Sequence, residues 1–267
     1  MSPGPVRVVL CMIVRNESSV IERCLDSALP YADGYVVSDT GSSDATTHLI
    51  EQAGARHGVP GAIRRHEWQH FGHNRTLSAQ EARAWAAAQG WPPESTYLLF
   101  LDADMVLRAD AGFDKQALSA TCYSLVQDDG TLRYWNIRLA CLSHGWEAVG
   151  VTHEYWQPLG SGVTSARLES LWIEDRLDGG NKGDKFQRDI RLLTRALEAE
   201  PNNPRNVLYL AQSYFDTGRW ADAVRTYERR CASWHSAGQA PITSLVRGCS
   251  IPAAPARAPR PRWTGLS

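Results

Sequence analysis

Short apolar runs alternate with helix-patterned segments along the first hundred residues. Strands are predicted at 6–14, 35–38, 62–66 and 97–101, and helices at 17–29, 45–54 and 76–88. Continuous apolar runs are typical of strands that are buried on both faces of a parallel sheet. Their alternation with helices predicts an α/β domain with a largely parallel sheet and helices on both faces.

The pattern becomes weaker in the middle of the chain. Residues 132–142 alternate in the manner of a strand, and residues 149–156 are predicted to form another short strand. The segment 160–183 has no clear period and is predicted to be irregular. A cluster of Asp, Gly, Asn and Lys at 178–185 reads either as a mobile flap or as a plain turn.

From about residue 186 the pattern is helical throughout. Apolar stripes at helical spacing are separated by Pro201–Pro204 and by Gly218, which predicts three helices. The stripes, the small Ala residues and the Pro-Asn-Asn break resemble a tetratricopeptide repeat. Only about one and a half repeats are present, and such arrays normally need about three. These helices should therefore pack on the first domain, pair with another chain, or be marginally stable.

These patterns divide the chain into three parts. We expect an α/β domain at 1–180, a helical region at 181–232 and a disordered tail at 233–267. The tail is rich in Ala, Pro and Arg and lacks apolar periodicity. Because no amphipathic cap follows the last helix, we hypothesise that the repeat array ends early, through an altered reading frame.

Composition narrows the class of protein. The formal net charge is -1, so no basic field for nucleic acid is evident. The six cysteines include no C-x-x-C pair, and Cys11 and Cys24 lie in core-like patterns, which favours buried thiols in a reducing compartment. The apolar run at 8–14 is too short for a membrane span. A cytoplasmic protein is expected.

The most informative motif is Asp102-Ala103-Asp104, which follows the apolar strand at 97–101. Ligands of open α/β sheets bind beyond the carboxyl ends of the strands. Residues i and i+2 of a strand point the same way, so both carboxylates face one side. Two hard oxygen donors suit Mg²⁺ or Mn²⁺. The alternative is a polar strand exit into a turn.

Four further polar clusters follow predicted strands. They are Arg15-Asn16-Glu17, Asp39-Thr40-Gly41-Ser42-Ser43-Asp44, His73-Asn74-Arg75 and His153-Glu154. Right-handed crossovers would bring the strand exits at Arg15, Asp39 and Asp102 to one edge of the sheet. Each cluster alone is a weak signal, but their order along the chain predicts a single site.

In this order the clusters resemble the family 2 glycosyltransferases with the GT-A fold. The motifs that carry the resemblance are 12–17, 37–46, Trp68, 71–75, 99–104 and 150–156. The chain looks closest to the bacterial branch in which tetratricopeptide repeats follow the transferase domain. The resemblance covers roughly residues 6–230 and implies a mixed, Rossmann-like sheet that binds a nucleotide-diphospho-sugar.

The resemblance implies a nucleotide-sugar site made of nine residues. Asp39 would accept a hydrogen bond from the base, Glu17 would lie near base or ribose, and Arg75 would contact the diphosphate. The other members are Ile13, Val14, Arg15, Gly41, Asp102 and Ala103. The residues also allow simpler roles: Glu17 as a first-turn acid on a helix, Asp39 and Asp44 in turn and cap chemistry, and Arg75 as a solvent-facing arginine.

The resemblance also implies a metal and a general base. Asp104 is the first choice for contact with Mn²⁺ or Mg²⁺, with Asp102 serving the sugar and also the metal, and His153 resembles a third ligand. Glu154 is the candidate base that removes the acceptor proton, and Asp175 is its rival. His153 could instead be a core or loop histidine.

The predicted function is transfer of a sugar, with inversion, from a nucleotide-diphosphate sugar, expected to be a UDP-sugar. The acceptor is open among a glycan, a lipid-linked glycan, a peptide and a small molecule. Aromatic residues in the second half form either an acceptor platform or core packing: Trp135, Trp146, Tyr155 and Trp156. The helical region allows a protein partner or self-association.

Two other functions are weighed against this one. Sugar-phosphate nucleotidylyltransfer would need a Gly-rich N-terminal phosphate loop, and residues 12–17 contain no glycine. A non-catalytic scaffold that binds partners through its helices is the other alternative. The retained carboxylates argue against that scaffold, and the short repeat array limits any peptide groove.

Overall fold

The central layer of the protein is an eight-stranded mixed sheet in the order β3-β2-β1-β4-β7-β6-β10-β5. The computed structural model describes residues 4–179 and 185–236. The strands are β1 (Arg7–Val14), β2 (Gly34–Asp39), β3 (Gly61–Arg65), β4 (Thr96–Phe100), β5 (Met105–Ala109), β6 (Cys122–Asp128), β7 (Arg133–Cys141) and β10 (Ser165–Asp175). A separate hairpin is formed by β8 (Gly145–Val149) and β9 (Tyr155–Leu159).

The first half of the sheet follows the prediction. β3, β2, β1 and β4 pair in parallel, and β2 and β4 are buried along their whole length, as continuous apolar runs require. The register places Val14 beside Asp39 and Cys11 beside Phe100. The carboxyl ends of β1, β2 and β4 therefore lie along one edge, as expected.

The second half differs from the prediction. The segment 160–183, predicted to be irregular, contains β10, which pairs in parallel with β6 and antiparallel with β5. Its sequence pattern is weak because its first half is only partly buried. The single strand predicted at 149–156 is wrong: it spans the turn between β8 and β9. Gly150 and His153 adopt φ values of 117° and 51° there, which an extended strand does not accommodate.

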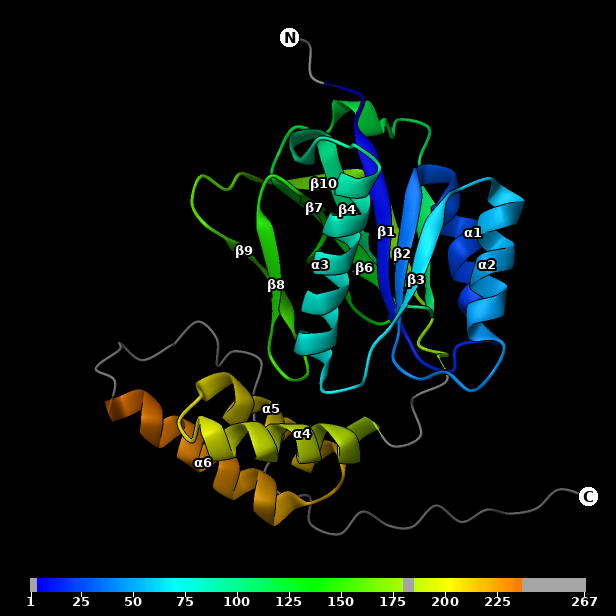
Figure 1. Cartoon of the computed structure of the whole chain (residues 1–267). Coiled ribbons are helices and arrows are strands. Elements are labelled where there is room, and N and C mark those ends of the chain that lie inside the picture. The colour runs from blue at the N-terminus through cyan, green and yellow to red at the C-terminus, as the bar shows by residue number, and fades with distance from the viewer. Residues whose placement is uncertain (1–3, 180–184, 237–267) are drawn as a thin grey trace, which may run out of the picture.

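Helices cover both faces of the sheet (Figure 1). They are α1 (Ile21–Ala28), α2 (Thr46–His57) and α3 (Phe71–Ala88). One core forms between the sheet and α1 and α2, and a second core forms between the sheet, α3 and the β8–β9 hairpin. Strands β1, β2 and β4 are thus buried on both faces, whereas β10 is only partly buried.

Two helices begin at other residues than predicted. α1 starts at Ile21 because Asn16 has a positive φ of 56° and its Oδ1 accepts a hydrogen bond from Ser43 N at 2.8 Å. Asn16 therefore joins two loops and does not cap α1. α3 starts at Phe71, five residues earlier than predicted, because His70 Nδ1 caps it by accepting from His73 N at 3.1 Å.

Three helices follow the sheet and lie together at one of its ends (Figure 1). They are α4 (Lys185–Ala199), α5 (Pro204–Asp216) and α6 (Trp220–Ser236). Asn203 caps α5 by accepting from Arg205 N and Asn206 N, and Pro204 occupies the first turn. Buried residues of α4 and α5 pack with Val151 of the β8–β9 turn. Of the three expectations for these helices, packing on the first domain is the one observed.

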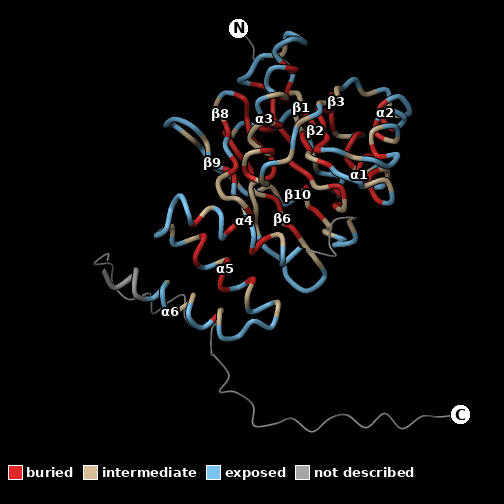
Figure 2. The backbone as a smooth tube through the Cα atoms, turned by 60° about the horizontal axis from the view of Figure 1, so that its bottom comes forward, coloured by how far each residue is buried: buried red, intermediate tan, exposed pale blue. Residues whose placement is uncertain are grey.

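The outermost helix is largely exposed (Figure 2). Trp220 and Val224 of α6 are 59% and 56% exposed. α6 continues to Ser236, past the boundary predicted at residue 232, and the rest of the predicted tail lies outside the described residues. Cys11, Cys24, Cys122 and Cys141 are buried free thiols. Among the described helices, none combines the length and the apolar character needed to span a bilayer.

Candidate functional site

The turns that follow β1 and β2 are tied to each other. Asn16 N donates to Ser42 Oγ at 3.0 Å, and Ser43 N donates to Asn16 Oδ1 at 2.8 Å. Asp39, which is buried, accepts from Ser42 N at 2.9 Å. Asp39 therefore has the turn role that the sequence allowed, and its contact with a nucleotide base stays a prediction.

Asp44 completes this pair of turns. Its carboxylate accepts from Thr46 N at 3.0 Å and from Ser18 N at 3.1 Å. Burial acts to raise the pKa of Asp44, but the hydrogen bonds from Thr46 and Ser18 outweigh it and lower that pKa to about 2. The backbone of Glu17 is held by the same residue, because Glu17 N donates to Thr46 Oγ1 at 2.8 Å. Asp44 acts as a structural turn residue.

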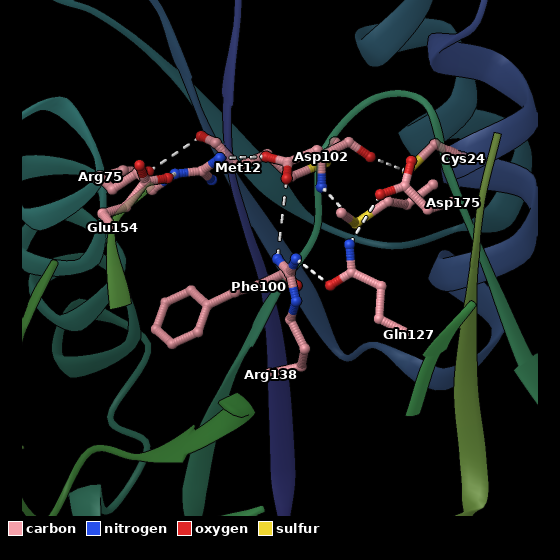
Figure 3. A network of polar contacts seen from close by, with 11 residues as sticks. Met12, Cys24, Arg75, Phe100, Asp102, Gln127, Arg138, Glu154 and Asp175 are labelled. Carbon is pink, nitrogen blue, oxygen red and sulfur yellow. Dashed lines mark hydrogen bonds and ion pairs between the residues drawn. The ribbon is translucent and has the colours of Figure 1, made fainter. Parts of the chain in front are cut away.

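Asp102 lies between two arginines at the end of β4 (Figure 3). Arg75 Nη2 donates to Asp102 Oδ1 at 2.6 Å, and Arg138 Nη1 lies 3.8 Å from Asp102 Oδ2. Burial acts to raise the pKa of Asp102, but the charges of Arg75 and Arg138 outweigh it and hold that pKa below its usual value. Asp102 is therefore ionised and fixed in place.

Arg75 connects this carboxylate to Glu154. It lies in α3, and its Nε donates to Glu154 Oε1 in addition to the bond with Asp102. Its side chain is 13% exposed, so the alternative of a solvent-facing arginine is wrong. The guanidinium fork suits two carboxylates at once. Contact of Arg75 with a diphosphate stays a prediction.

The same network reaches Asp175 through two residues that the sequence prediction did not name. Arg138 Nη2 donates to Gln127 Oε1 at 2.6 Å, and Gln127 Nε2 donates to Asp175 Oδ2 at 2.8 Å. Burial raises the pKa of Asp175, and the negative charges of Asp104 and Asp102 add to the rise. The signal in the sequence was a charged residue inside an apolar strand: Arg138 is 6% exposed, and a buried arginine needs a partner.

Asp104 faces a separate part of the edge. Arg176 N donates to its backbone oxygen at 3.1 Å, and Gly179 N donates to its Oδ2 at 3.4 Å. A side chain on Gly179 would come within 3.2 Å of Asp104 Oδ2 and 3.1 Å of Glu17 Oε2. Two carboxylates from different turns therefore converge on one glycine.

His153 contacts the helical region. Its ring stacks on Tyr209 of α5 with a centroid distance of 4.2 Å, and its Nε2 is 3.9 Å from Asp189 Oδ2. Burial lowers the pKa of His153 and outweighs the negative charge of Asp189, which acts to raise that pKa. Within residues 4–179 and 185–236 no three His, Cys, Asp or Glu side chains are grouped to hold a metal ion.

The remaining predicted site residues follow the strand ends. Ile13 and Val14 end β1, and Arg15 is exposed just beyond it. Gly41 has a positive φ of 107° in the turn after β2, and Ala103 is buried between the two aspartates. All five lie at the edge expected for a ligand, and their contacts with a nucleotide stay predictions.

The four aromatic residues predicted as platform or core separate into two groups. Trp146 and Trp156 are buried, and Trp156 stacks on Phe100 with ring centroids 3.7 Å apart, so both belong to the core. Trp135 is half-buried, and Tyr155 is 42% exposed beneath the guanidinium of Arg205. Part of the predicted flap, including Gly180 and Lys182, lies outside the described residues.

Comparison with known families matches both regions of the chain. Residues 9–114 match the family described as Glycosyl transferase family 2, and residues 185–230 match a tetratricopeptide repeat family. A TPR repeat-containing protein of Synechococcus elongatus is 36% identical over 105 residues, which are 39% of this chain and 22% of that protein. The chain therefore spans less than a quarter of that relative's length.

Solved structures with some similarity include chains from S. aureus and Mycobacterium tuberculosis. S. aureus TarS 1–349 in complex with UDP-GlcNAc is 13% identical, with a TM-score of 0.39 over 79% of this chain and 73% of that chain. Glucosyl-3-phosphoglycerate synthase from Mycobacterium tuberculosis, in complex with Mn²⁺, UDP and glucosyl-3-phosphoglycerate, is 20% identical, with a TM-score of 0.25 over 39% and 35%. Likeness at this level assigns no ligand to this chain.

The sequence match and the sheet agree with the expected fold. The matched segment contains the parallel strands β1 to β4 and both aspartates of the Asp102-Ala103-Asp104 motif. The helical match falls on α4, α5 and most of α6. The chain therefore combines a region that matches the glycosyl transferase family 2 with a region that matches a tetratricopeptide repeat family.

Proposed function

We propose that this protein transfers a sugar from a nucleoside-diphosphate sugar, with UDP-sugar as the donor, to an acceptor hydroxyl with inversion at the anomeric carbon. The supporting observation is the chain of contacts that joins Glu154, Arg75, Asp102, Arg138, Gln127 and Asp175 at the carboxyl edge of the sheet. Such an edge is where α/β sheets bind nucleotides.

The donor would lie over the turns that follow β1, β2 and β4. In this proposal Glu17 and Asp39 contact the nucleoside, and Asp102 accepts hydrogen bonds from sugar or ribose hydroxyls. Asp102 suits that task because Arg75 and Arg138 keep its carboxylate charged and oriented. Arg75 then acts mainly as a positioning residue that connects Asp102 and Glu154.

The residues near Gly179 fit a divalent metal ion. Asp104 Oδ2 and Glu17 Oε2 both converge on this glycine, and hard carboxylate oxygens suit Mn²⁺ or Mg²⁺. Mg²⁺ is usually held by one or two carboxylates together with substrate phosphates, so a third protein ligand is not required. We propose Asp104 as the main ligand and leave out His153, whose ring packs on Tyr209. A bound metal supplies positive charge to the departing diphosphate.

Of the two candidate bases, Asp175 fits the task better than Glu154. Glu154 already accepts a hydrogen bond from the guanidinium of Arg75, so its carboxylate is engaged within the protein. Asp175 accepts a hydrogen bond from the neutral Gln127 amide, and its pKa is raised by burial and by nearby negative charge. A raised pKa suits a general base. Asp175 would take the proton of the acceptor hydroxyl while that oxygen bonds to the anomeric carbon and the nucleoside diphosphate leaves.

Calorimetry with UDP tests the donor site. UDP is expected to bind in the presence of Mn²⁺, and Asp104→Asn is expected to abolish the Mn²⁺-dependent part of the affinity. Asp110→Asn is a matched control, because Asp110 follows β5 and its carboxylate accepts from Gly112 N in an exposed turn. Equal binding of UDP by wild type and Asp104→Asn would reject the metal assignment, and no binding of UDP would reject the donor.

A further inference from the structure

A groove lies over strands β6, β7 and β10. Its volume is about 500 Å³, within the range of 300–1,000 Å³ that is usual for small-molecule sites. The lining residues are Val126, Arg133, Tyr134, Trp135, Glu169 and Trp172. Of these, the sequence singled out only Trp135, and none belongs to the proposed donor or metal site.

Three aromatic side chains line this groove, and core packing does not account for them. Trp135 and Trp172 are half-buried, Tyr134 is 38% exposed, and none of the three belongs to either hydrophobic core of the sheet. The guanidinium of Arg167 lies 5.0 Å from the centre of the Trp135 ring and steadies that indole. Aromatic faces at a concave surface offer apolar contact area to a ligand.

The groove lies on the opposite face of the sheet from the side chain of Asp175. Trp172 and Asp175 are three residues apart in a regular part of β10, so their side chains point to opposite faces. Val126, which lines the groove, and Gln127, which donates to Asp175, alternate in the same way on β6. The groove is therefore a surface separate from the proposed base.

The charges of the groove are mixed in sign. Arg133 is paired with Asp128 at 2.9 Å, Glu169 is negative, and Arg167 lies over an indole. This balance offers hydrogen-bond donors and acceptors without a strong net field, which suits neutral hydroxyl groups better than phosphates. A pyranose ring has both an apolar face for the indoles and hydroxyl groups for the polar rim.

We propose that this groove binds an oligosaccharide apart from the proposed base, with sugar rings packed on Trp135 and Trp172. The assignment goes beyond the proposed transferase function, because the groove would hold a glycan chain outside the site of sugar transfer.

Nuclear magnetic resonance of the tryptophan indoles tests this assignment in the full chain. The probes are tetrasaccharides of glucose, of N-acetylglucosamine and of xylose, titrated separately into ¹⁵N-labelled protein with UDP and Mn²⁺ present. At least one is expected to shift the indole signals of Trp135 and Trp172. The exposed Trp220 on α6 serves as the internal control and is expected not to shift.

Variants make the result specific. Trp172→Ala is expected to weaken binding of the active tetrasaccharide about tenfold or more, Trp172→Phe is expected to retain part of it, and Trp220→Ala is expected to bind like wild type. Circular dichroism checks that each variant folds. If UDP binds but no tetrasaccharide shifts Trp135 and Trp172, the groove assignment is overturned and the donor proposal stands. If UDP does not bind but the shifts occur, the donor proposal fails and the groove remains a sugar site.

Discussion

Two regions of the site are built in different ways. The turns after β1, β2 and β4 are held by hydrogen bonds between neighbouring strand ends, as between Asn16 and Ser43. The β8–β9 turn, residues 150–154, is held by the repeat helices: His153 stacks on Tyr209, and Arg205 donates to its backbone oxygen. The first region is held within the sheet and its covering helices, whereas the second also depends on α5 of the helical region.

This difference indicates that the helices have a structural role in the transferase region. Arg205 also lies 4.8 Å from the Tyr155 ring and 4.9 Å from the Tyr209 ring. Together these contacts fix the turn that carries Glu154, whose carboxylate pairs with Arg75. Arg75 is the point where the two regions meet, because it also binds Asp102.

The largest expected effect compares the two base candidates, Asp175 at the end of β10 and Glu154 in the β8–β9 turn. Asp175→Asn should reduce the rate of sugar transfer by about 10²–10⁴-fold, the usual contribution of a general base. Glu154→Gln should lower the rate by less than about tenfold, because the amide still accepts a hydrogen bond from Arg75. Single-turnover transfer measured with saturating donor gives both values. A larger loss of rate in Glu154→Gln than in Asp175→Asn would show that Glu154, in the β8–β9 turn, is the base.

The next effect concerns the arginine that joins the regions. Arg75→Met should lower the free energy of unfolding by about 3–5 kcal/mol, because it leaves two largely buried carboxylates without their main partner. Arg108→Met is the matched control: Arg108 pairs with Glu174 at the surface, and its loss should cost less than about 1 kcal/mol. Urea unfolding measures both variants, and similar losses would show that the Arg75 network does not stabilise the fold.

A smaller effect tests the helical support. Arg205→Met should increase hydrogen exchange in the β8–β9 turn and destabilise the protein by about 1–2 kcal/mol, through loss of cation–π contacts and one hydrogen bond. Arg219→Met removes a comparable contact, with Tyr214, inside the helical region and should leave exchange in residues 150–154 unchanged. If hydrogen exchange in residues 150–154 is unchanged in Arg205→Met, the helices do not hold this turn in place.

The smallest effect belongs to the strand-end turns. The pKa of Asp44 is about 2 in the folded protein and 3.8 ordinarily. Its contribution to stability is therefore present above about pH 4 and is lost as the pH falls towards 2. Asp44→Asn should have a thermal midpoint that falls less between pH 5 and pH 3 than that of wild type. Parallel declines in both proteins would mean that Asp44 does not hold these turns.

The first half of the fold was predictable because its strands are buried on both faces. Burial forces a continuous apolar run, which marks β1, β2 and β4 and places the polar exits at their ends. β10 was not predictable in this way, because its first residues are only partly buried and its partners β6 and β5 are distant in the chain. The turn at 150–154 was hidden because its positive φ at His153 leaves no signature in the sequence.

The site residues also differ in whether the sequence indicated them. Asp102, Asp104 and Arg75 could be named from motifs at strand ends. Arg138 and Gln127 lie within strands and belong to no such motif, and their partners come from other strands. The choice between Glu154 and Asp175 also needed the structure. It depends on whether the neighbour of each carboxylate is the charged Arg75 or the neutral Gln127.

The sequence by itself determined the parallel half of the sheet and the edge at which polar residues gather, because these follow from local apolar runs and short motifs. Only the tertiary structure decided which side chains meet: Asp102 with two arginines, His153 with Tyr209, and Trp135 with Trp172 in one groove. These contacts join residues far apart in the chain, and their geometry depends on packing between elements, which no local pattern encodes.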